Sequence, residues 1–196
     1  MDTIVALWVA AMATCFLGIC GAAQILRKDI DPIQVPLTLY LNGPGGGLVR
    51  LSYYAMASGL LALAAQLLHS ARPLKHAAAA LIGISALMLP VLVATRPVPG
   101  PPGKVHSLAF HRASTYFTFV SLIVGMSIVS INTANLQQDG GLRFWGVPLA
   151  LLAALGLTLS IFARRLPHGL VQKLLILTIV LWLYWVSIAL YLGQVA

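Results

Sequence analysis

The sequence is poor in charge, and its acidic residues are rarer than its basic ones. It contains no Glu and four Asp, at positions 2, 29, 31 and 139, and charged residues make up only 8% of its 196 residues. Soluble domains are about a quarter charged. Together with 60% hydrophobic residues, this excludes a water-soluble globular protein and a disordered tail. Two Cys are too few for a disulfide-stapled secreted module.

The missing carboxylates also bear on chemistry. Pumps and coupled transporters usually bind the transported proton or cation at a carboxylate inside the membrane. Hydrolases usually use a pair of carboxylates as acid and base. All four Asp lie outside the long apolar runs. The sequence therefore argues against both ion-coupled transport and hydrolysis within the membrane, and it supplies no candidate catalytic residue.

The most prominent feature of the sequence is its long apolar runs. A helix that crosses a hydrocarbon core of about 30 Å needs roughly 17 to 25 apolar residues, and no run shows the alternation of a transmembrane strand. The first run is read as a retained helix, because Asp2 precedes it and Arg27 and Lys28 follow it, unlike a signal peptide. We predict an all-α polytopic membrane protein, a single domain over residues 1–196 with six transmembrane helices at about 4–26, 48–68, 77–95, 109–131, 147–163 and 174–195.

The basic residues are distributed unevenly between the two sides of this topology. The first, third and fifth loops and their flanks hold nine of the 12 Lys and Arg, and the other side holds Arg72, Lys75 and Arg143. Because short loops rich in Lys and Arg stay in the cytoplasm, both termini are expected to be non-cytoplasmic. The net charge of +8 then reflects orientation and attraction to anionic lipid headgroups, so nucleic acid is not an expected partner.

Small and polar residues recur at helical spacing. His111, Ser114, Thr118, Ser121 and Gly125 are separated by 3, 4, 3 and 4 residues, which places them on one face of the fourth span. Small residues let helix backbones approach closely in lipid. This face is either a packing seam or the wall of a polar pocket that opens toward His111 and its neighbour Arg112. Helix packing is also expected at Gly18, Gly59 and Gly156.

Basic and imidazole side chains on the predicted cytoplasmic side form a candidate lipid- or anion-binding set: Arg50, Arg96, His106, His111, Arg112 and His168. Residues 43–47, Gly-Pro-Gly-Gly-Gly, precede a helix and could form a backbone nest for a lipid phosphate. The histidines lack companion carboxylates or Cys, so no metal site is predicted. The sequence specifies no cofactor.

Several short motifs resemble those of a known family. They are Gly-Pro-Gly-Gly-Gly-Leu at 43–48, Gly59 in the second span, a Pro-rich link after the third span, and Val-His-Ser-Leu-Ala at 105–109. In these the chain resembles the bacterial membrane proteins of domain of unknown function 998, which implies six helices and the bacterial inner membrane. Such proteins often have an acidic residue after the third span, where this chain reads Thr95-Arg96-Pro97.

Two functions fit this pattern. The first is a non-catalytic accessory or scaffold subunit of a larger membrane complex, whose partners are other membrane protein subunits. The second is binding or transport of a lipid or hydrophobic small molecule, or its modification, at a basic His/Arg site on the cytoplasmic face. In both, membrane lipids with anionic headgroups are expected contacts on the cytoplasmic side.

Overall fold

The computed structural model describes residues 2–70, 72–96, 105–134, 144–163 and 165–195, with the backbone alone for 105–108. Within these ranges the chain is helical and contains no strand. The elements are α1 (Asp2–Leu26), the 3-10 helix η1 (Leu37–Leu41), α2 (Gly46–Leu68), α3 (Pro73–Ala94), α4 (Val105–Ala134), α5 (Gly146–Phe162) and α6 (His168–Tyr191). The predicted all-α bundle of six apolar helices is confirmed.

The helices match a membrane in length. Apolar stretches of 22 to 26 residues lie in α1, α2, α3, α4 and α6. The fifth helix, α5, is shorter at 17 residues, which is about 26 Å of helix and close to the thickness of a hydrocarbon core. The chain is therefore a multi-pass membrane protein.

The sixth helix differs from its predicted span of 174–195. It begins six residues earlier, at His168, and ends at Tyr191. Gly193 adopts a positive φ of 68°, a left-handed conformation that ends helices and that Gly adopts without strain. The amides of Gly193 and Gln194 then donate to the carbonyls of Leu190 and Ala189. The apolar residues after Tyr191 follow a turn rather than the helix.

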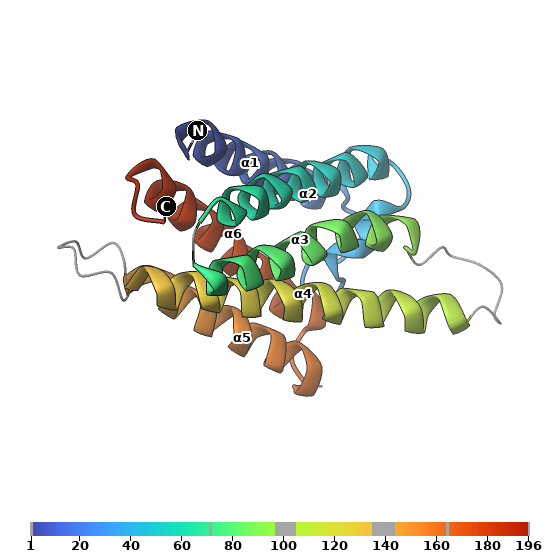
Figure 1. Cartoon of the computed structure of the whole chain (residues 1–196). Coiled ribbons are helices and arrows are strands. Elements are labelled where there is room, and N and C mark those ends of the chain that lie inside the picture. Colours follow the sequence, from blue (N-terminus) through green and yellow to red (C-terminus); the bar gives the residue numbers. More distant parts are fainter. Residues whose placement is uncertain (1, 71, 97–104, 135–143, 164, 196) are drawn as a thin grey trace.

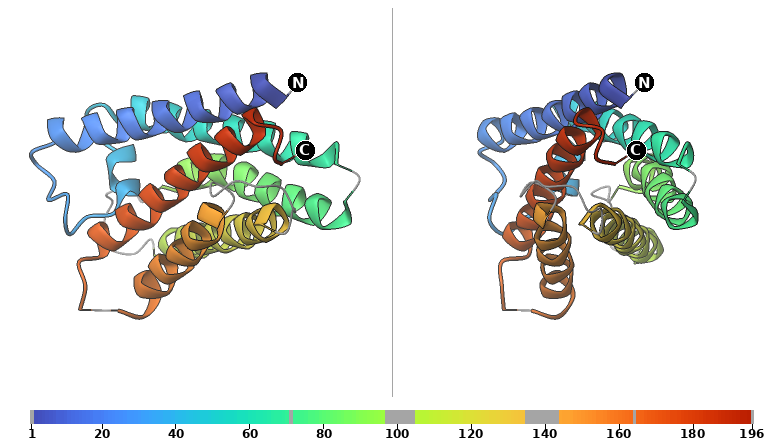
Figure 2. Two further views of the ribbon diagram at one scale, coloured as in Figure 1. Left: turned by 90° about the vertical axis from the view of Figure 1, so that its left-hand side faces the viewer. Right: turned by 60° about the vertical axis from the view of Figure 1, so that its left-hand side comes forward.

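The six helices form a closed ring. Each helix packs on the next in sequence, and α6 closes the ring by packing on α1. Figure 2 shows the helices following one another around the bundle axis, with α6 between α5 and α1. Because consecutive helices run in opposite directions, every contact in the ring is antiparallel, including the closing one.

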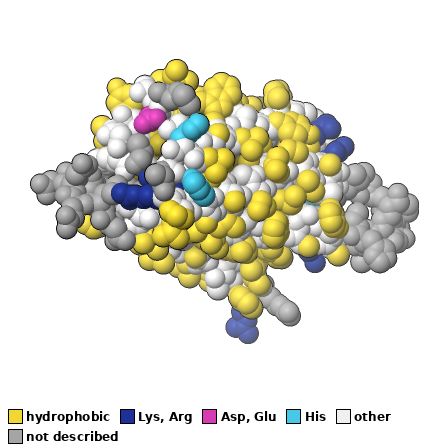
Figure 3. All heavy atoms as spheres, viewed as in Figure 1, with side chains coloured by type: hydrophobic (Ala, Val, Ile, Leu, Met, Phe, Trp, Pro, Cys, Tyr) yellow, Lys and Arg dark blue, Asp and Glu magenta, His cyan; other side chains and the backbone are white. Residues whose placement is uncertain are grey.

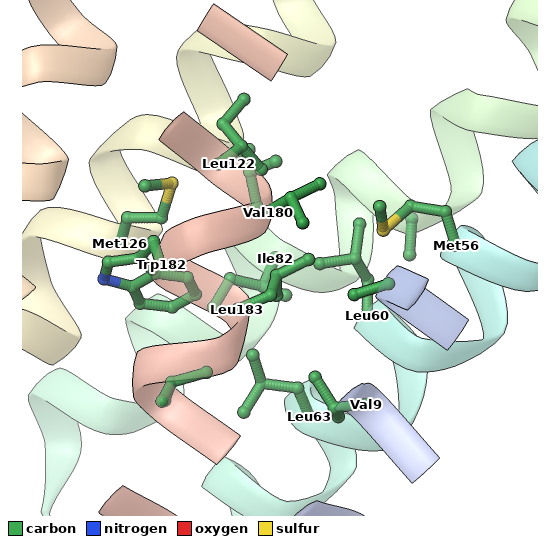
Figure 4. Close-up of a cluster of buried hydrophobic side chains, with 14 of the residues drawn as sticks. Val9, Met56, Leu60, Leu63, Ile82, Leu122, Met126, Val180, Trp182 and Leu183 are labelled. Carbon is green, nitrogen blue, oxygen red and sulfur yellow. The ribbon is translucent and has the colours of Figure 1, made fainter. Parts of the chain in front are cut away.

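Large apolar side chains fill the middle of the ring. Trp182 is fully buried, and its indole Nε1 donates a hydrogen bond to Ser130 Oγ at 2.9 Å. Around it, Figure 4 shows Val9, Met56, Leu60, Leu63, Ile82, Leu122, Met126, Val180 and Leu183. Hydrophobic side chains also cover the outside of the bundle (Figure 3), as expected for a surface that faces lipid.

Polar side chains join neighbouring helices inside this apolar bundle. Ser85 on α3 and Ser121 on α4 are hydrogen-bonded at 2.8 Å, and Thr14 on α1 bonds Tyr184 on α6 at 2.8 Å. Such bonds between transmembrane helices contribute about 0.6 kcal/mol on average. They specify how each helix is rotated about its own axis, and their contribution to the stability of the bundle is small.

The two ends of the bundle differ in charge. Both termini lie at one end, as Figure 1 shows. The opposite end, here called the basic end, is formed by the ends of α1, α3 and α5 and the starts of α2, α4 and α6. Its described basic residues are Arg27, Lys28, Arg50, Arg96, Arg112, Arg165 and Lys173. Lys104, Arg143 and Arg164 lie outside the described residues.

Glycines permit close contact at three helix pairs but not at a fourth expected position. A Cβ on Gly59 would lie 3.1 Å from Met12 Cβ of α1, one on Gly125 2.8 Å from Ile82 Cγ1 of α3, and one on Gly156 3.2 Å from Leu175 Cβ of α6. Gly18 is exposed, and a Cβ there would meet nothing within 4 Å. Gly18 therefore contacts no other helix within the described part of this chain, because that side of α1 faces outward, and its role in helix packing stays a prediction.

A segment between α1 and α2, here called the strap (residues 31–41), lies across the start of α6. The amides of Gly169 and Leu170 donate to the carbonyls of Gln34 at 3.2 Å and Ile33 at 2.8 Å. The first amides of a helix have no partner within the helix, so the strap caps α6. Lys173 Nζ also donates to the Pro32 carbonyl.

We predict that Gly125→Leu destabilises the bundle by about 1–3 kcal/mol, the usual cost of overpacking a core, because Ile82 of α3 occupies the space that the new side chain needs. Gly18→Leu makes the same change at an exposed helix position and should leave stability unchanged. Thermal unfolding in detergent measures both variants. Equal unfolding temperatures would contradict the proposed α3–α4 contact.

We predict that Gly169→Ala loosens the strap. Its new Cβ would lie 2.4 Å from the carbonyl oxygen of Val35, and backbone atoms cannot yield as a flexible side chain can. Hydrogen–deuterium exchange over residues 31–41 should quicken about fivefold or more, the effect of losing one ordinary hydrogen bond. Gly47→Ala, where a Cβ meets nothing within 4 Å, is the control. Unchanged exchange in Gly169→Ala would show that the strap does not depend on this contact.

Candidate functional site

A cavity of about 490 Å³ opens at the basic end of the bundle. Its walls come from residues 111–119 of α4, the start of α6, the end of α5 and the strap. The lining residues are Pro36, Thr38 and Leu39 of the strap, His111, Arg112, Thr115, Tyr116 and Phe119 of α4, Ser160, Ile161 and Ala163 of α5 and its end, Leu166, and His168 and Gln172 of α6. Pockets of this size are typical of small-molecule sites.

The cavity exists because α4 and α5 separate toward the basic end. Figure 1 shows the two helices close together at the start of α5 and diverging along its length. Ile161, at the end of α5, lines the cavity and is 41% exposed. The site therefore adjoins the flank of the bundle that faces lipid, as well as its end.

Cationic and imidazole groups stand at the mouth. Arg112 and His168 are exposed, whereas His111 beside them is buried. Within the described residues neither Arg112 nor His168 has a hydrogen-bond partner. None of the described residues that line the cavity carries a carboxylate. The mouth therefore offers positive charge to an anion, without a competing acidic side chain on the cavity wall.

The ring of His111 is oriented by the end of α3. Its Nδ1 lies 3.4 Å from Thr95 Oγ1, and that hydroxyl already donates to the Val91 carbonyl at 2.8 Å. Thr95 can therefore only accept, which assigns the proton to Nδ1 and leaves Nε2 of a neutral ring as an acceptor. The assignment gives His111 a fixed orientation at the edge of the cavity.

Below the mouth, uncharged polar side chains lie among the apolar residues of the lining. Thr38, Thr115 and Gln172 lie at this level. The hydroxyl of Thr115 donates to the His111 carbonyl at 2.8 Å, and Gln172 Oε1 accepts from the Leu37 amide of the strap at 3.0 Å. Gln172 is only 9% exposed, so its amide is a buried polar group on the cavity wall.

A second, smaller cavity of about 50 Å³ continues toward the middle of the bundle. It shares Thr38, Thr115, Phe119 and Gln172 with the first. Its other walls are apolar apart from Thr118 and Tyr53: Phe16, Met56, Leu60, Leu89, Leu92, Leu122, Ile176, Ile179 and Val180. The two cavities therefore share part of their walls, and the second has the more apolar lining.

The positions of the lining residues along α6 show how deep each of them lies in the bundle. His168, Gln172, Ile176 and Val180 follow at intervals of four and share one face. With a rise of 1.5 Å per residue, Gln172 lies about 6 Å below His168, and Val180 about 12 Å below Gln172. On α4, Arg112, Thr115 and Leu122 repeat the order from cation to hydroxyl to apolar side chain.

The structure brings together three of the six candidate binding residues, His111, Arg112 and His168. Arg50 and Arg96 are at the basic end but do not line the cavity. Arg50 Nε donates to the Gly46 carbonyl at 3.2 Å, and Arg96 Nε donates to Asn42 Oδ1 at 3.1 Å. The side chain of His106 lies outside the described residues.

The polar face of the fourth span points into the bundle, as both sequence interpretations required. Ser114, Thr118 and Ser121 are buried together with Gly125. Ser121 bonds Ser85 of α3 and Gly125 contacts the same helix, whereas Thr118 borders the inner cavity. One face of α4 thus serves packing along α3 and also forms part of the cavity wall.

The Gly-rich loop before α2 is organised around a cation. Arg27 donates to the carbonyl of Asn42 at 2.7 Å and to both carboxylate oxygens of Asp29, at 2.8 and 2.7 Å. This pairing lowers the pKa of Asp29 and raises that of Arg27. Arg27 also lies against Gly43, 3.1 Å from where a Cβ would be. The loop presents carbonyls to Arg27 rather than an open nest of amides to a phosphate.

Sequence reasoning missed residues that line both cavities. Gln172 and Thr38 stand alone in apolar surroundings and belong to no motif, so no spacing singled them out. Gly169 was equally inconspicuous, although it is where the strap touches α6. Gln172 also lies two residues before the predicted sixth span of 174–195, so the hydropathy pattern gave no reason to place it inside the bundle.

Metal binding has no support in the described part of the chain, where no group of three or more His, Cys, Asp or Glu is placed to hold an ion. His76, for example, bonds the Ser70 carbonyl at 2.7 Å, at the end of the bundle opposite the cavity.

Comparison with known proteins places the chain in a family and leaves its activity open. No curated protein and no solved structure matches it. A family model described as "Protein of unknown function (DUF998)" matches residues 5–189, which include all the cavity residues and nearly the whole six-helix bundle. The chain therefore belongs to the DUF998 family.

Proposed function

We propose that this protein binds an anionic, amphipathic lipid in the cavity between α4, α5, α6 and the strap. The observation that carries the proposal is the order of side chains with depth: Arg112 and His168 at the mouth, uncharged polar groups below, and an apolar inner cavity. A phospholipid has the same order, from phosphate through glycerol to hydrocarbon chain.

The position of the cavity supports entry from the membrane. Because α4 and α5 diverge toward the basic end (Figure 1), a lipid in that leaflet can reach the mouth from the side without crossing the bilayer. The headgroup would meet Arg112, whose planar guanidinium suits phosphate, while the first part of a hydrocarbon chain would meet the apolar residues between the two cavities. Binding is the activity that this order of side chains with depth supports.

The proposal places the protein in the bacterial inner membrane with the basic end in the cytoplasm. The support is the predominance of Lys and Arg at that end, which is the arrangement typical of cytoplasmic loops. Both termini are then on the opposite side, and the site draws its lipid from the cytoplasmic leaflet, whose anionic headgroups attract basic surfaces.

We predict that the double variant Arg112→Gln/His168→Gln retains several-fold less anionic lipid than the natural protein, because it removes the exposed cationic and imidazole groups at the mouth. The protein is reconstituted in vesicles of equal parts phosphatidylglycerol and phosphatidylcholine, extracted in mild detergent and examined by native mass spectrometry. The natural protein should retain phosphatidylglycerol in preference to phosphatidylcholine.

Arg165→Gln is the control, since Arg165 is exposed at the same end and does not line the cavity. It should retain as much phosphatidylglycerol as the natural protein. Equal retention by the double variant, or equal loss in the control, would refute a specific site in the cavity and leave only general attraction to a basic surface.

We predict that a membrane-impermeant maleimide labels Ser70→Cys in intact cells but labels Lys28→Cys only after permeabilisation. Position 70 lies between α2 and α3, and position 28 follows α1 at the basic end. Both Cys variants are made after Cys15 and Cys20 are replaced by Ala. The reverse pattern would invert the proposed orientation.

The accessory-subunit role stays a prediction, and extraction from the native membrane addresses it directly. Other polypeptides in fixed stoichiometry with the protein would support a subunit of a larger complex. A protein that travels alone with one retained lipid would favour the binding function proposed above.

A further inference from the structure

We propose that Gln172 recognises an acyl carbonyl of the bound lipid, so that the site selects ester-linked over ether-linked phospholipids. This inference rests on the proposed lipid-binding function and adds the class of lipid. It follows from the orientation of one buried amide at the junction between the two cavities.

The strap fixes which way the amide of Gln172 points. Its partner is the backbone N–H of Leu37, at 3.0 Å from Oε1. Because a backbone N–H can only donate, the atom facing Leu37 must be the carbonyl oxygen of the side chain. Nε2, with two hydrogens to donate, therefore lies on the other side of the amide, away from the strap.

The Nε2 group has no acceptor of its own within the described part of the chain. Gln172 borders both cavities and is 91% buried, being 9% exposed. Nε2 is not among the fully buried unpartnered atoms of the described residues, so this donor is open to the cavity that Gln172 lines. An acceptor oxygen on a bound molecule would satisfy this donor.

Two of the hydroxyls on the cavity wall, those of Thr115 and Ser160, already use their hydrogens, whereas those of Thr38 and Tyr116 make no hydrogen bond within the described residues. Thr115 donates to the His111 carbonyl at 2.8 Å, and Ser160 donates to the Leu157 carbonyl at 2.7 Å. They can accept a hydrogen bond but have no hydrogen left to give. Gln172 thus supplies an amide donor at a level where these neighbours cannot donate.

The depth of Gln172 identifies the acceptor. It lies about 6 Å below His168 at the mouth, and the apolar inner cavity begins on its far side. In a phospholipid whose phosphate is at the mouth, the group at the boundary between headgroup and hydrocarbon is the ester linkage. An ester presents a carbonyl acceptor there, whereas an ether presents none of comparable strength.

The test uses two phosphatidylglycerols of equal chain length, one with ester-linked and one with ether-linked chains, mixed in equal amounts in one vesicle preparation. Native mass spectrometry of the extracted protein gives the ratio of the two retained lipids. One hydrogen bond corresponds to roughly a three- to tenfold preference, so the natural protein should retain the ester in that excess.

Gln172→Glu is the informative variant. Its carboxylate still accepts from the Leu37 amide, so the strap is retained, but the donor is gone, and the ester-to-ether ratio should fall to about one. The added negative charge affects both lipids equally, because their headgroups are identical. Gln34→Glu makes the same change on an exposed strap residue and should keep the preference.

The outcomes separate the two proposals. Retention of neither lipid by the natural protein would refute the lipid-binding function itself. Retention of both without preference would leave that function standing and overturn the role of Gln172. A preference that persists in Gln172→Glu, with amide exchange at residues 31–41 unchanged, would also overturn it, because the donor would then be absent and the selectivity intact.

Discussion

Backbone hydrogen bonds between the strap and the first turn of α6 hold the whole basic end in place. Gly169 and Leu170 donate to carbonyls of Gln34 and Ile33, which supplies acceptors to a helix start that has no side-chain cap. The same contact carries Thr38 to the cavity wall and holds Leu37 against Gln172. The place of Thr38 on the cavity wall and the orientation of the Gln172 amide both depend on the strap lying against α6. This contact requires a residue without a side chain at position 169.

The number and nature of the helices could be predicted from the sequence because lipid allows few alternatives. A backbone in the hydrocarbon core must satisfy its own hydrogen bonds, so a long apolar run is a helix. The residue at which a helix ends could not be predicted in this way. The span expected to reach Val195 stops at Tyr191, because the local conformation of Gly193 ends the helix whereas hydropathy continues past it.

The site was predictable only where its residues had a recognisable chemical character. Positive charge and imidazole identified His111, Arg112 and His168, which do meet at the cavity. The same character also selected Arg50 and Arg96, which bond backbone and side-chain oxygens elsewhere at that end. Small residues showed the same ambiguity, since Gly125 contacts α3 while Gly18 faces outward. Which side of a helix meets a neighbour depends on the ring order, and no periodicity in one helix contains that information.

The closed order of the ring has a consequence for how the protein is made. Gln172 is separated from its strap partner Leu37 by 135 residues, and Thr14 of α1 is separated from Tyr184 of α6, to which it bonds, by 170 residues. In a chain synthesised from its N-terminus, the strap is made early, before the start of α6 to which it binds. During most of synthesis the strap must stay at the membrane surface with its carbonyls hydrated. The cavity comes into existence in a single late step, when α6 inserts between α5 and α1, so a stalled or truncated chain has the outer walls of the bundle but no site.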